Sequence, residues 1–402
     1  MRMLDSGETM EASKKRVAIV GSPDLEFYGG TQVDVIQLAN LLSESGYEVT
    51  IYGSGTYFRR REVDLRKGIQ YFRNSFGFDP FSFHSILTLT SGVSEPLIGM
   101  FTAKRISRVV GAYDAYYITA PKFVLYALTK YVIRNQPVVI GNYGTYIEYL
   151  MSRENFISKS LINLFDSIFL KYAKSKNYTI HALNTVQRDH YLKMGIDASN
   201  IFIIPQCDVD FSKFKVRDND QFRVLFLNRL SNDKGAHLIP DIANDCKDIE
   251  FVVIGDGPLM GLLKEKCGSN VRLTGFLSEE DKEDEVGKCD ALLNLSRYES
   301  LSISSIEGIA SGLTVVSRNK TSGLSLIQDK VRESVLFGEG TAGSISSIIR
   351  KIKGEKENDK RQFLEKKLRI RSTGESVFDK RVVTSEMLEL VRYAFSAESA
   401  AP

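Results

Sequence analysis

Short runs of aliphatic and β-branched residues alternate along the chain with segments in which apolar residues recur every three or four positions. In the first half, such runs predict six strands, at residues 16–20, 48–52, 115–118, 138–140, 178–183 and 201–204. Between the first two, residues 32–45 carry Val33, Ile36 and Leu41 at helical spacing. Alternating strands and helices are typical of βαβ units, so we predict an α/β fold with parallel sheets.

The same pattern restarts in the second half. Further strands are predicted at residues 223–227, 249–254, 271–274, 291–295 and 314–317. Pro205 and the polar segment 212–221 lie at the junction. We therefore predict two doubly wound domains, residues 1–205 and residues 206–375.

The last part of the chain has a different pattern. Residues 351–375 are rich in charge and are expected to form helix and surface loop. An amphipathic helix is predicted from Ser376 to Phe395. Its expected buried side chains are Val377, Phe378, Val382, Val383, Met387, Leu390, Val391 and Tyr393.

Composition narrows the class of protein. The 402 residues are 43% apolar and 26% charged, which excludes a disordered, collagen-like or coiled-coil chain. No stretch reaches the roughly 18 consecutive apolar residues of a membrane-spanning helix, and the first twenty residues lack the order of a signal peptide. Four cysteines without C-x-x-C spacing favour a reducing compartment over a disulfide framework or a zinc site. These features predict a cytoplasmic protein without a metal site.

Charge is distributed unevenly between the two halves. Residues 1–205 hold 23 Lys and Arg against 18 Asp and Glu, a balance of +5, whereas residues 206–402 have a balance of −2. In the first half, basic and aromatic residues cluster at 57–61, 66–67, 104–105 and 108, with Lys122 further along. They form either a solvated surface or a face toward anionic lipid headgroups. The apolar segment 156–172 fits either that membrane face or a buried helix. Nucleic acid is not expected as a partner, because no recognition motif is present and the pI is near 8.4.

Candidate chemistry follows the predicted strands, since ligands of parallel sheets bind beyond the strands' carboxyl ends. After the strand at 291–295, Glu299 and Glu307 stand eight positions apart, with Leu301, Ser302 and Ile303 between them. The first carboxylate can accept hydrogen bonds from sugar hydroxyls, and the second from a ribose diol. The intervening backbone N–H groups suit phosphate. The alternative is that both are ordinary acids at a helix start.

Three further loops carry similar signals. Arg229 and Lys234, in NRLSNDKG, can neutralise a pyrophosphate or can be plain surface cations. Gly255 and Gly257, in GDGP, allow a ligand to approach the backbone, although a simple turn needs them too. The last loop holds Phe276 and Leu277, whose main-chain groups can read a nucleobase edge.

In the first half, Gly29 and Gly30 follow the first strand and precede a helix. Their backbone N–H groups can approach phosphate from the opposite side of a cleft between the two domains.

Taken in order, these features resemble a family-4 glycosyltransferase of the GT-B fold over nearly the whole chain. Gly29-Gly30 resembles the family's glycine-rich donor loop, and NRLSNDKG resembles its G-R-L…K-G segment. Glu299 and Glu307 resemble its E-x7-E pair. The resemblance implies two facing Rossmann-like domains, with the terminal helix (376–397) crossing back onto the first.

The resemblance also implies roles. Arg229 and Lys234 would clamp the diphosphate, Glu299 would contact the donor sugar and Glu307 would contact the ribose. The reaction would be retaining and metal-independent, with a nucleotide sugar as co-substrate and no cofactor.

This chain departs from the family at several positions. Tyr143 stands where many members have a His, and a phenol with a pKa near 10 is a poor base at neutral pH. Asn228 and Ser302 replace glycines. The segment IPQCDVDFSKF has one extra residue. Because a departing phosphate can take the acceptor's proton, Tyr143 is compatible with catalysis, and it is kept as a candidate catalytic residue.

The function predicted from these residues is sugar transfer from a UDP- or GDP-sugar to a hydroxyl acceptor. The acceptor is expected to be a glycan or glycolipid at the cytoplasmic face of a membrane, with the enzyme peripheral there. An NAD-dependent oxidoreductase is disfavoured because GSPDLEFYGG lacks the G-x-G-x-x-G spacing. The E-x7-E pair disfavours a sugar-nucleotide epimerase. A non-catalytic sugar-nucleotide-binding or scaffold protein of the same fold is the alternative.

Overall fold

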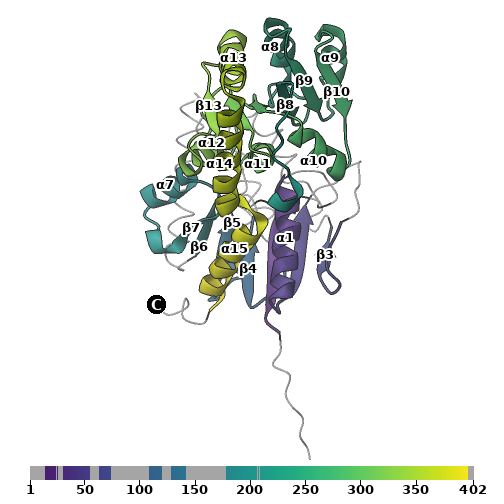
Figure 1. Cartoon of the computed structure of the whole chain (residues 1–402). Helices are drawn as coiled ribbons and strands as arrows, with labels where there is room; N and C mark the ends of the chain where they lie inside the picture. The colour runs from purple at the N-terminus through teal and green to yellow at the C-terminus, as the bar shows by residue number, and fades with distance from the viewer. Residues whose placement is uncertain are drawn as a thin grey trace, which may run out of the picture. The chain divides into compact units, whose positions relative to one another are not determined.

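The computed structural model (Figure 1) describes residues 14–23, 25, 30–54, 63–73, 108–119, 128–141, 178–205, 207 and 209–396. The chain divides into two compact units. One contains the described residues of Met1–Gly141, Lys171–Thr179 and Tyr393–Pro402, and the other contains those of Ile180–Arg392. Among the described residues, no helix is long and apolar enough to cross a membrane.

The first sheet has seven strands in the order β3-β2-β1-β4-β5-β6-β7. Strand β1 pairs in parallel with both of its neighbours, so that Val20 lies opposite Tyr52 of β2 and Ile118 of β4. The strands are β1 (Arg16–Pro23), β2 (Glu48–Ser54), β3 (Gln70–Phe72), β4 (Ala115–Ile118), β5 (Val138–Gly141), β6 (Thr179–Ala182) and β7 (Ile201–Ile203). All six predicted strands are confirmed, and the short edge strand β3 is additional.

The second sheet has six strands in the order β10-β9-β8-β11-β12-β13. They are β8 (Arg223–Leu227), β9 (Glu250–Ile254), β10 (Val271–Gly275), β11 (Ala291–Asn294), β12 (Thr314–Ser317) and β13 (Val335–Phe337). The five predicted strands are confirmed, and β13 was missed. After β8, the next strands β9 and β10 are added toward one edge of the sheet. After β11, strands β12 and β13 are added toward the other edge. The boundary between β8 and β11 is therefore the topological switch point, where ligands of such sheets bind.

Helices connect the strands. They are α1 (Gly30–Glu44), α7 (Thr185–Lys193), α8 (Ile239–Asp245), α9 (Met260–Lys266), α10 (Glu279–Gly287), α11 (Ile303–Ala310) and α12 (Ser322–Lys330). Within the described ranges, short 3-10 turns lie at Ala198–Asn200, Phe211–Lys213 and Ala236–Leu238.

The chain ends in three helices, α13 (Ala342–Asn358), α14 (Lys360–Phe378) and α15 (Lys380–Phe395). Residues 351–375 are thus helical except at Asp359, and the predicted surface loop there was wrong. The last helix begins at Lys380 rather than Ser376, because Asp379 is extended (φ −61°, ψ 138°). The Asp379 carboxylate instead accepts a hydrogen bond from the Phe211 N–H at 3.1 Å.

Burial along α15 follows the predicted stripe in part, and two predicted residues, Val377 on α14 and Val382 on α15, are only half-buried. Val383, Met387, Leu390 and Val391 are buried, but Tyr393 is 40% exposed. Ala394 and Phe395 are buried in its place, because Phe395 packs against the ring of Tyr47 at 5.9 Å between centroids.

A buried ionic cluster ties the last helices to the second sheet. Asp290, just before β11, is paired with Lys356 of α13 at 2.8 Å and with Lys367 of α14 at 2.9 Å. Burial lowers the pKa of Lys367, although the charge of Asp290 opposes that shift. Removing one member would leave an uncompensated buried charge, so this cluster holds α13 and α14 in place on the sheet that carries the site.

Candidate functional site

Two of the predicted donor loops of the second half meet at the switch point of the second sheet. Lys234 lies in the loop after β8, and Glu299 lies in the loop after β11. Their side chains form an ion pair with 2.7 Å between Lys234 Nζ and Glu299 Oε1. The exposed fractions are 25% for the Lys234 side chain and 9% for the Glu299 side chain. Two oppositely charged residues that are 65 positions apart in the sequence thus form a partly buried ion pair.

The two loops are packed closely enough to fix this pair. Gly235 has a φ of +74°, and a Cβ there would lie 2.1 Å from the Leu295 carbonyl oxygen. The Arg297 N–H also donates to the Asp233 carbonyl at 2.9 Å. Only glycine at position 235 allows the β8 loop to approach the end of β11 so closely.

Arg229 is in the same loop but is held differently. Its guanidinium lies 3.5 Å from the Asp233 carboxylate, and its side chain is 59% exposed. Its own N–H donates to the Asn228 Oδ1 at 2.9 Å. The pair with Asp233 is a weak surface contact, so the Arg229 side chain can turn toward a ligand at little cost.

Glu307 on α11 has a partner that the sequence did not reveal. Lys282 of α10 lies 2.8 Å from it and also 2.6 Å from Glu279. Burial raises the pKa of Glu307 above its usual value, although the charge of Lys282 opposes the shift. Burial alone would lower the pKa of Lys282, but the charge of Glu307 and the hydrogen bond to Glu279 outweigh it, so that pKa is raised. The one signal in the sequence was a single Lys within the acidic run EEDKEDE.

The start of α11 is capped by a buried hydroxyl. Ser302 is its N-cap residue, and its Oγ accepts from the Ser305 N–H. Asn294, the last residue of β11, donates to the same Oγ at 2.7 Å. The Ser302 side chain is thus occupied inside the protein. A ligand at this helix start would therefore meet backbone N–H groups of the first turn and of Leu301, Ser302 and Ile303, rather than the Ser302 hydroxyl.

The GDGP turn after β9 packs against the β8 loop. A Cβ at Gly255 (φ +137°) would lie 2.1 Å from the Asn228 carbonyl oxygen, and one at Gly257 (φ +159°) would lie 2.5 Å from the Leu230 carbonyl oxygen. The glycines are therefore required by close contact between loops, whether or not a ligand also approaches them.

Replacing Gly255 with alanine is expected to lower the free energy of unfolding by about 2 kcal/mol, because the added methyl meets backbone and φ is positive. Gly261→Ala is the matched control, since a Cβ at Gly261 on α9 has nothing within 4 Å. It should leave stability unchanged or raise it by up to about 1 kcal/mol. Chemical denaturation measures both, and equal stabilities for the two variants would contradict the assignment.

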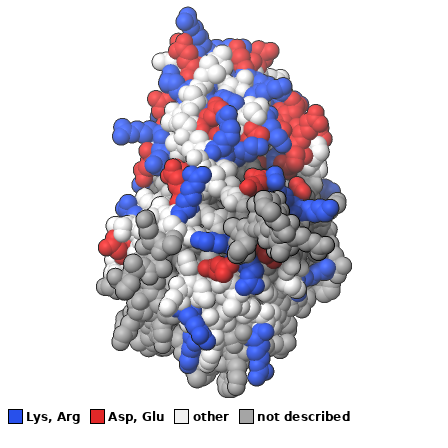
Figure 2. All heavy atoms as spheres, turned by 90° about the horizontal axis from the view of Figure 1, so that it is seen from below, with Lys and Arg blue, Asp and Glu red and all other residues white. Residues whose placement is uncertain are grey.

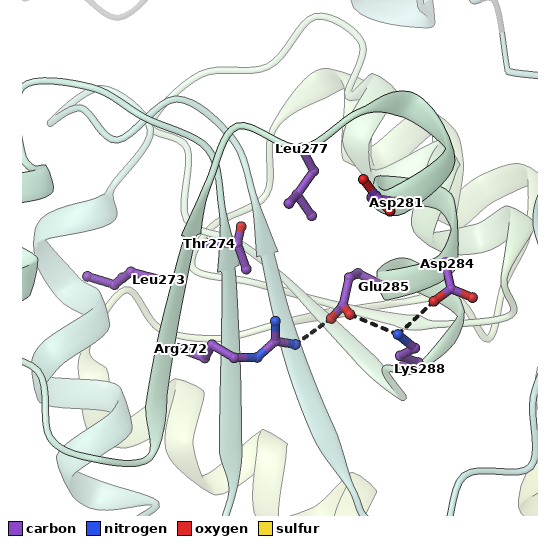
Figure 3. Close-up of a pocket in the computed structure, with 8 residues that line it drawn as sticks. All are labelled: Arg272, Leu273, Thr274, Leu277, Asp281, Asp284, Glu285 and Lys288. Atoms are coloured by element: carbon purple, nitrogen blue, oxygen red, sulfur yellow. Dashed lines mark hydrogen bonds and ion pairs between the residues drawn. The ribbon is translucent and has the colours of Figure 1, made fainter.

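Phe276 and Leu277 follow β10 as predicted. Phe276 is 75% exposed, whereas Leu277 lines a pocket of about 360 Å³ between β10 and α10 (Figure 3). Four of the pocket's five charged side chains pair with one another, and the fifth, Asp281, accepts a hydrogen bond from Ser278. Lys288 lies 2.9 Å from Glu285 and 2.6 Å from Asp284, and Arg272 also bonds Glu285. Lys234 and Glu299 are not among its lining residues.

Several predicted site residues lie outside the described part of the chain. These are Gly29 and Tyr143, and also the basic or aromatic positions 57–61, 104–105 and 122 and the segment 156–172. Gly30 is the first residue of α1. Among the described residues, no group of three or more His, Cys, Asp or Glu side chains is placed to hold a metal ion.

Comparison with known proteins agrees with this arrangement. The sequence model of the family "Glycosyl transferases group 1" matches residues 208–369, which contain the whole Lys234–Glu299 region. One subunit of human phosphatidylinositol N-acetylglucosaminyltransferase is 22% identical over 308 residues. That match covers 72% of this chain and spans 59% of the human protein.

Solved structures match over nearly the full length. Sucrose-phosphate synthase from Thermosynechococcus elongatus superposes with a TM-score of 0.73 at 16% identity, covering 96% of this chain and 100% of that one. Anabaena HepE in complex with UDP-glucose superposes with a TM-score of 0.65 at 14% identity, covering 94% of this chain and 100% of that one. With its two parallel Rossmann-like sheets and C-terminal helix, the chain has the GT-B fold, and its residues 208–369 match the group 1 glycosyltransferases.

Proposed function

We propose that this protein transfers a sugar from a nucleotide sugar to a hydroxyl acceptor with retention of configuration at the anomeric carbon. The observation that carries the proposal is the Lys234–Glu299 pair at the switch point between β8 and β11, 2.7 Å apart and partly buried. A diphosphate needs cations, and a sugar needs hydrogen-bond acceptors. The pair presents one of each at the position where such sheets bind ligands.

Each charged residue has a proposed role in that complex. Lys234 and the exposed Arg229 would neutralise the diphosphate, Lys as a point charge and Arg through its planar fork. Glu299 would accept hydrogen bonds from the donor sugar's hydroxyls. Glu307, held beside Lys282, would accept hydrogen bonds from the ribose diol. Main-chain groups near Phe276 and Leu277 would read the nucleobase, and the first turn of α11 would face the phosphates.

The proposed chemistry needs no side-chain base. The bond from the anomeric carbon to the diphosphate breaks first, which leaves a positively charged oxocarbenium-like sugar and a negatively charged leaving group. The acceptor hydroxyl attacks from the same face and gives its proton to the departing phosphate. Lys234 and Arg229 lower the barrier by stabilising the charge that develops on that phosphate. We propose that these cations act without a metal ion, and that Tyr143 donates a hydrogen bond to the sugar.

Uridine is the proposed base, since a structure of the same fold holds UDP-glucose; a GDP-sugar is the second candidate. A glycan or glycolipid is the proposed acceptor, because the human relative is named for a phosphatidylinositol substrate. We also propose that the enzyme works peripherally at the cytoplasmic face of a membrane. In the first unit, exposed cations such as Lys14, Lys67 and Arg108 support this. Figure 2 shows separate blue side chains and little red among the white and grey atoms in the lower half of the face drawn.

The test is a thermal-unfolding screen with UDP-, GDP- and ADP-sugars, followed by measurement of nucleotide release without acceptor. The true donor is expected to stabilise the protein by about 2.7 kcal/mol at 100 times its dissociation constant, and to release nucleotide slowly. Binding without any release would favour the scaffold alternative. If no nucleotide sugar stabilises the protein, the proposed function is wrong.

Membrane association is tested separately by flotation with liposomes of neutral or anionic lipid. Salt-sensitive binding to the anionic liposomes alone is expected, because exposed cations contribute about 1 kcal/mol each near such a surface. Equal recovery with both lipids would remove the membrane from the proposal and leave the transfer reaction untouched.

A further inference from the structure

Asn184 lies far from the predicted donor loops in the sequence but contacts one of them in the structure. It follows β6, is fully buried, and is the N-cap residue of α7, where its Oδ1 accepts from the Gln187 N–H at 3.0 Å. Its Nδ2 donates to the Ser300 carbonyl at 2.8 Å and lies 3.4 Å from the Ser322 Oγ. One amide thus joins the start of α7, the residue after Glu299, and the start of α12.

The same loop is held from the other side by α12. The Ser322 Oγ donates to the Glu299 carbonyl at 3.1 Å, and the Gly323 N–H donates to that carbonyl at 2.9 Å. A Cβ at Gly323 would lie 2.8 Å from the Ser300 carbonyl carbon and 2.9 Å from the Leu301 Cα. The two consecutive carbonyls at Glu299 and Ser300 are therefore both fixed by donors from outside their own loop.

Capping α7 does not by itself require an asparagine. Ser, Thr and Asp accept from the first-turn N–H groups about as well. An amide differs because it accepts through Oδ1 and donates through Nδ2, two separate atoms, whereas a Ser or Thr hydroxyl does both through one oxygen and an ionised Asp only accepts. Asn184 uses both atoms, Oδ1 for the Gln187 N–H and Nδ2 for the Ser300 carbonyl.

We propose that Asn184 is a positioning residue for donor-sugar recognition, which acts by fixing the backbone from which Glu299 projects. The inference rests on the proposed function, in which Lys234 turns to the diphosphate when the donor binds. The Glu299 carboxylate then no longer has its ion pair with Lys234. Its direction is set by the backbone at residues 299 and 300, whose carbonyls are fixed by hydrogen bonds. Ligand-binding groups must be placed to within about 0.5 Å, so a loosened loop weakens sugar binding.

The decisive variant is Asn184→Asp, which keeps the helix cap and removes the N–H donor. Isothermal titration at pH 7.5 would measure the dissociation constants of UDP and of the tightest-binding of UDP-glucose, UDP-galactose and UDP-N-acetylglucosamine. Affinity for the UDP-sugar is expected to fall about tenfold, the effect of one hydrogen bond. Affinity for UDP should change less than about threefold, because Glu299 contacts the sugar.

A pH series separates positioning from general stability. The introduced carboxyl is buried and faces a carbonyl, so it gains a proton more readily than an exposed carboxyl as the pH falls. Once protonated, it can donate to Ser300 as the amide does. The ratio of variant to wild-type dissociation constant for the UDP-sugar is therefore expected to return toward one between pH 7.5 and pH 5.5. A ratio that stays constant would count against the proposal.

Asn270→Asp is the matched control. Asn270 Nδ2 also donates to carbonyls, those of Ala243, Cys246 and Ile249, at the amino end of β10. It should lower stability without changing the ratio of UDP-sugar to UDP affinity. If Asn184→Asp fails to fold, Ser322→Ala replaces it, with an expected loss of about threefold for the UDP-sugar.

The outcomes separate the two proposals. A wild-type protein that binds the UDP-sugar, beside an Asn184→Asp or Ser322→Ala variant with unchanged affinity, overturns the positioning role alone. A wild-type protein that binds none of the UDP-, GDP- and ADP-sugars of the thermal screen overturns the proposed function and the positioning role with it.

Discussion

Lys234→Ala is expected to lower the rate of sugar transfer by at least about 100-fold, the usual effect of removing one preorganised group that stabilises developing charge. The variant loses a cation that we propose neutralises the leaving diphosphate. It also leaves the carboxylate of Glu299, only 9% exposed, without the partner that lies 2.7 Å away. Steady-state rates with the donor identified by the screen would measure the effect, and the loss should fall mainly on kcat.

Two further variants make the result specific. Lys366→Ala removes a comparable ion pair, with 2.9 Å between Lys366 and Glu355 and an 18% exposed lysine, on α13 and α14. It should transfer sugar at close to the wild-type rate. Lys234→Arg keeps the charge but not the point-like ammonium, so partial activity is expected. Transfer by Lys234→Ala at the wild-type rate would show that this residue is not the diphosphate clamp.

Acidification is expected to destabilise the protein through His181. This residue of β6 is completely buried, and its Nε2 lies 2.9 Å from the Ile204 carbonyl oxygen. Burial lowers its pKa to about 4 from the ordinary 6.5, although the hydrogen bond to Ile204 opposes the shift. The folded protein therefore keeps the ring neutral at a pH where the unfolded chain already takes up a proton.

The sign follows from this difference. Stability from His181 is fully present above pH 6.5 and is lost as the pH falls toward 4, where the folded protein begins to bind the proton too. The loss is about 3 kcal/mol at its full extent. Urea unfolding at several pH values measures it, with His181→Gln as the reference. If the wild type and the variant lose stability in parallel over this range, the buried neutral ring is not its cause.

The strands and the order of the donor loops could be predicted because they depend on local pattern. Runs of aliphatic residues mark β8 and β11 wherever they later pack. The two missed strands, β3 and β13, have three residues each. In β3, Gln70 and Phe72 are exposed, so no run of buried apolar residues marks it. The start of the last helix was misplaced because Asp379 interrupts an amphipathic pattern that continues on both sides of it.

The site was predicted less completely, because the sequence shows which residue types follow each strand but not which of them are in contact. Glu307 was expected to face a ribose, but its partner Lys282 was hidden in an acidic run. Asn184 had only the weak signal of a capping residue before a helix. Its contact with Ser300, 116 positions away, depends on a fold in which α7 and α12 pack together.

Local periodicity was therefore sufficient for the two-sheet α/β architecture, and the residue types after each strand were sufficient to suggest nucleotide-sugar chemistry. Which of those residues touch was settled by the tertiary structure alone. Because β8 and β11 are neighbours in the sheet although two strands separate them in the chain, Lys234 meets Glu299. The packing of α10 against α11 likewise brings Lys282 to Glu307. Contacts of this kind depend on strand order and helix packing, which are properties of the whole fold and not of any segment.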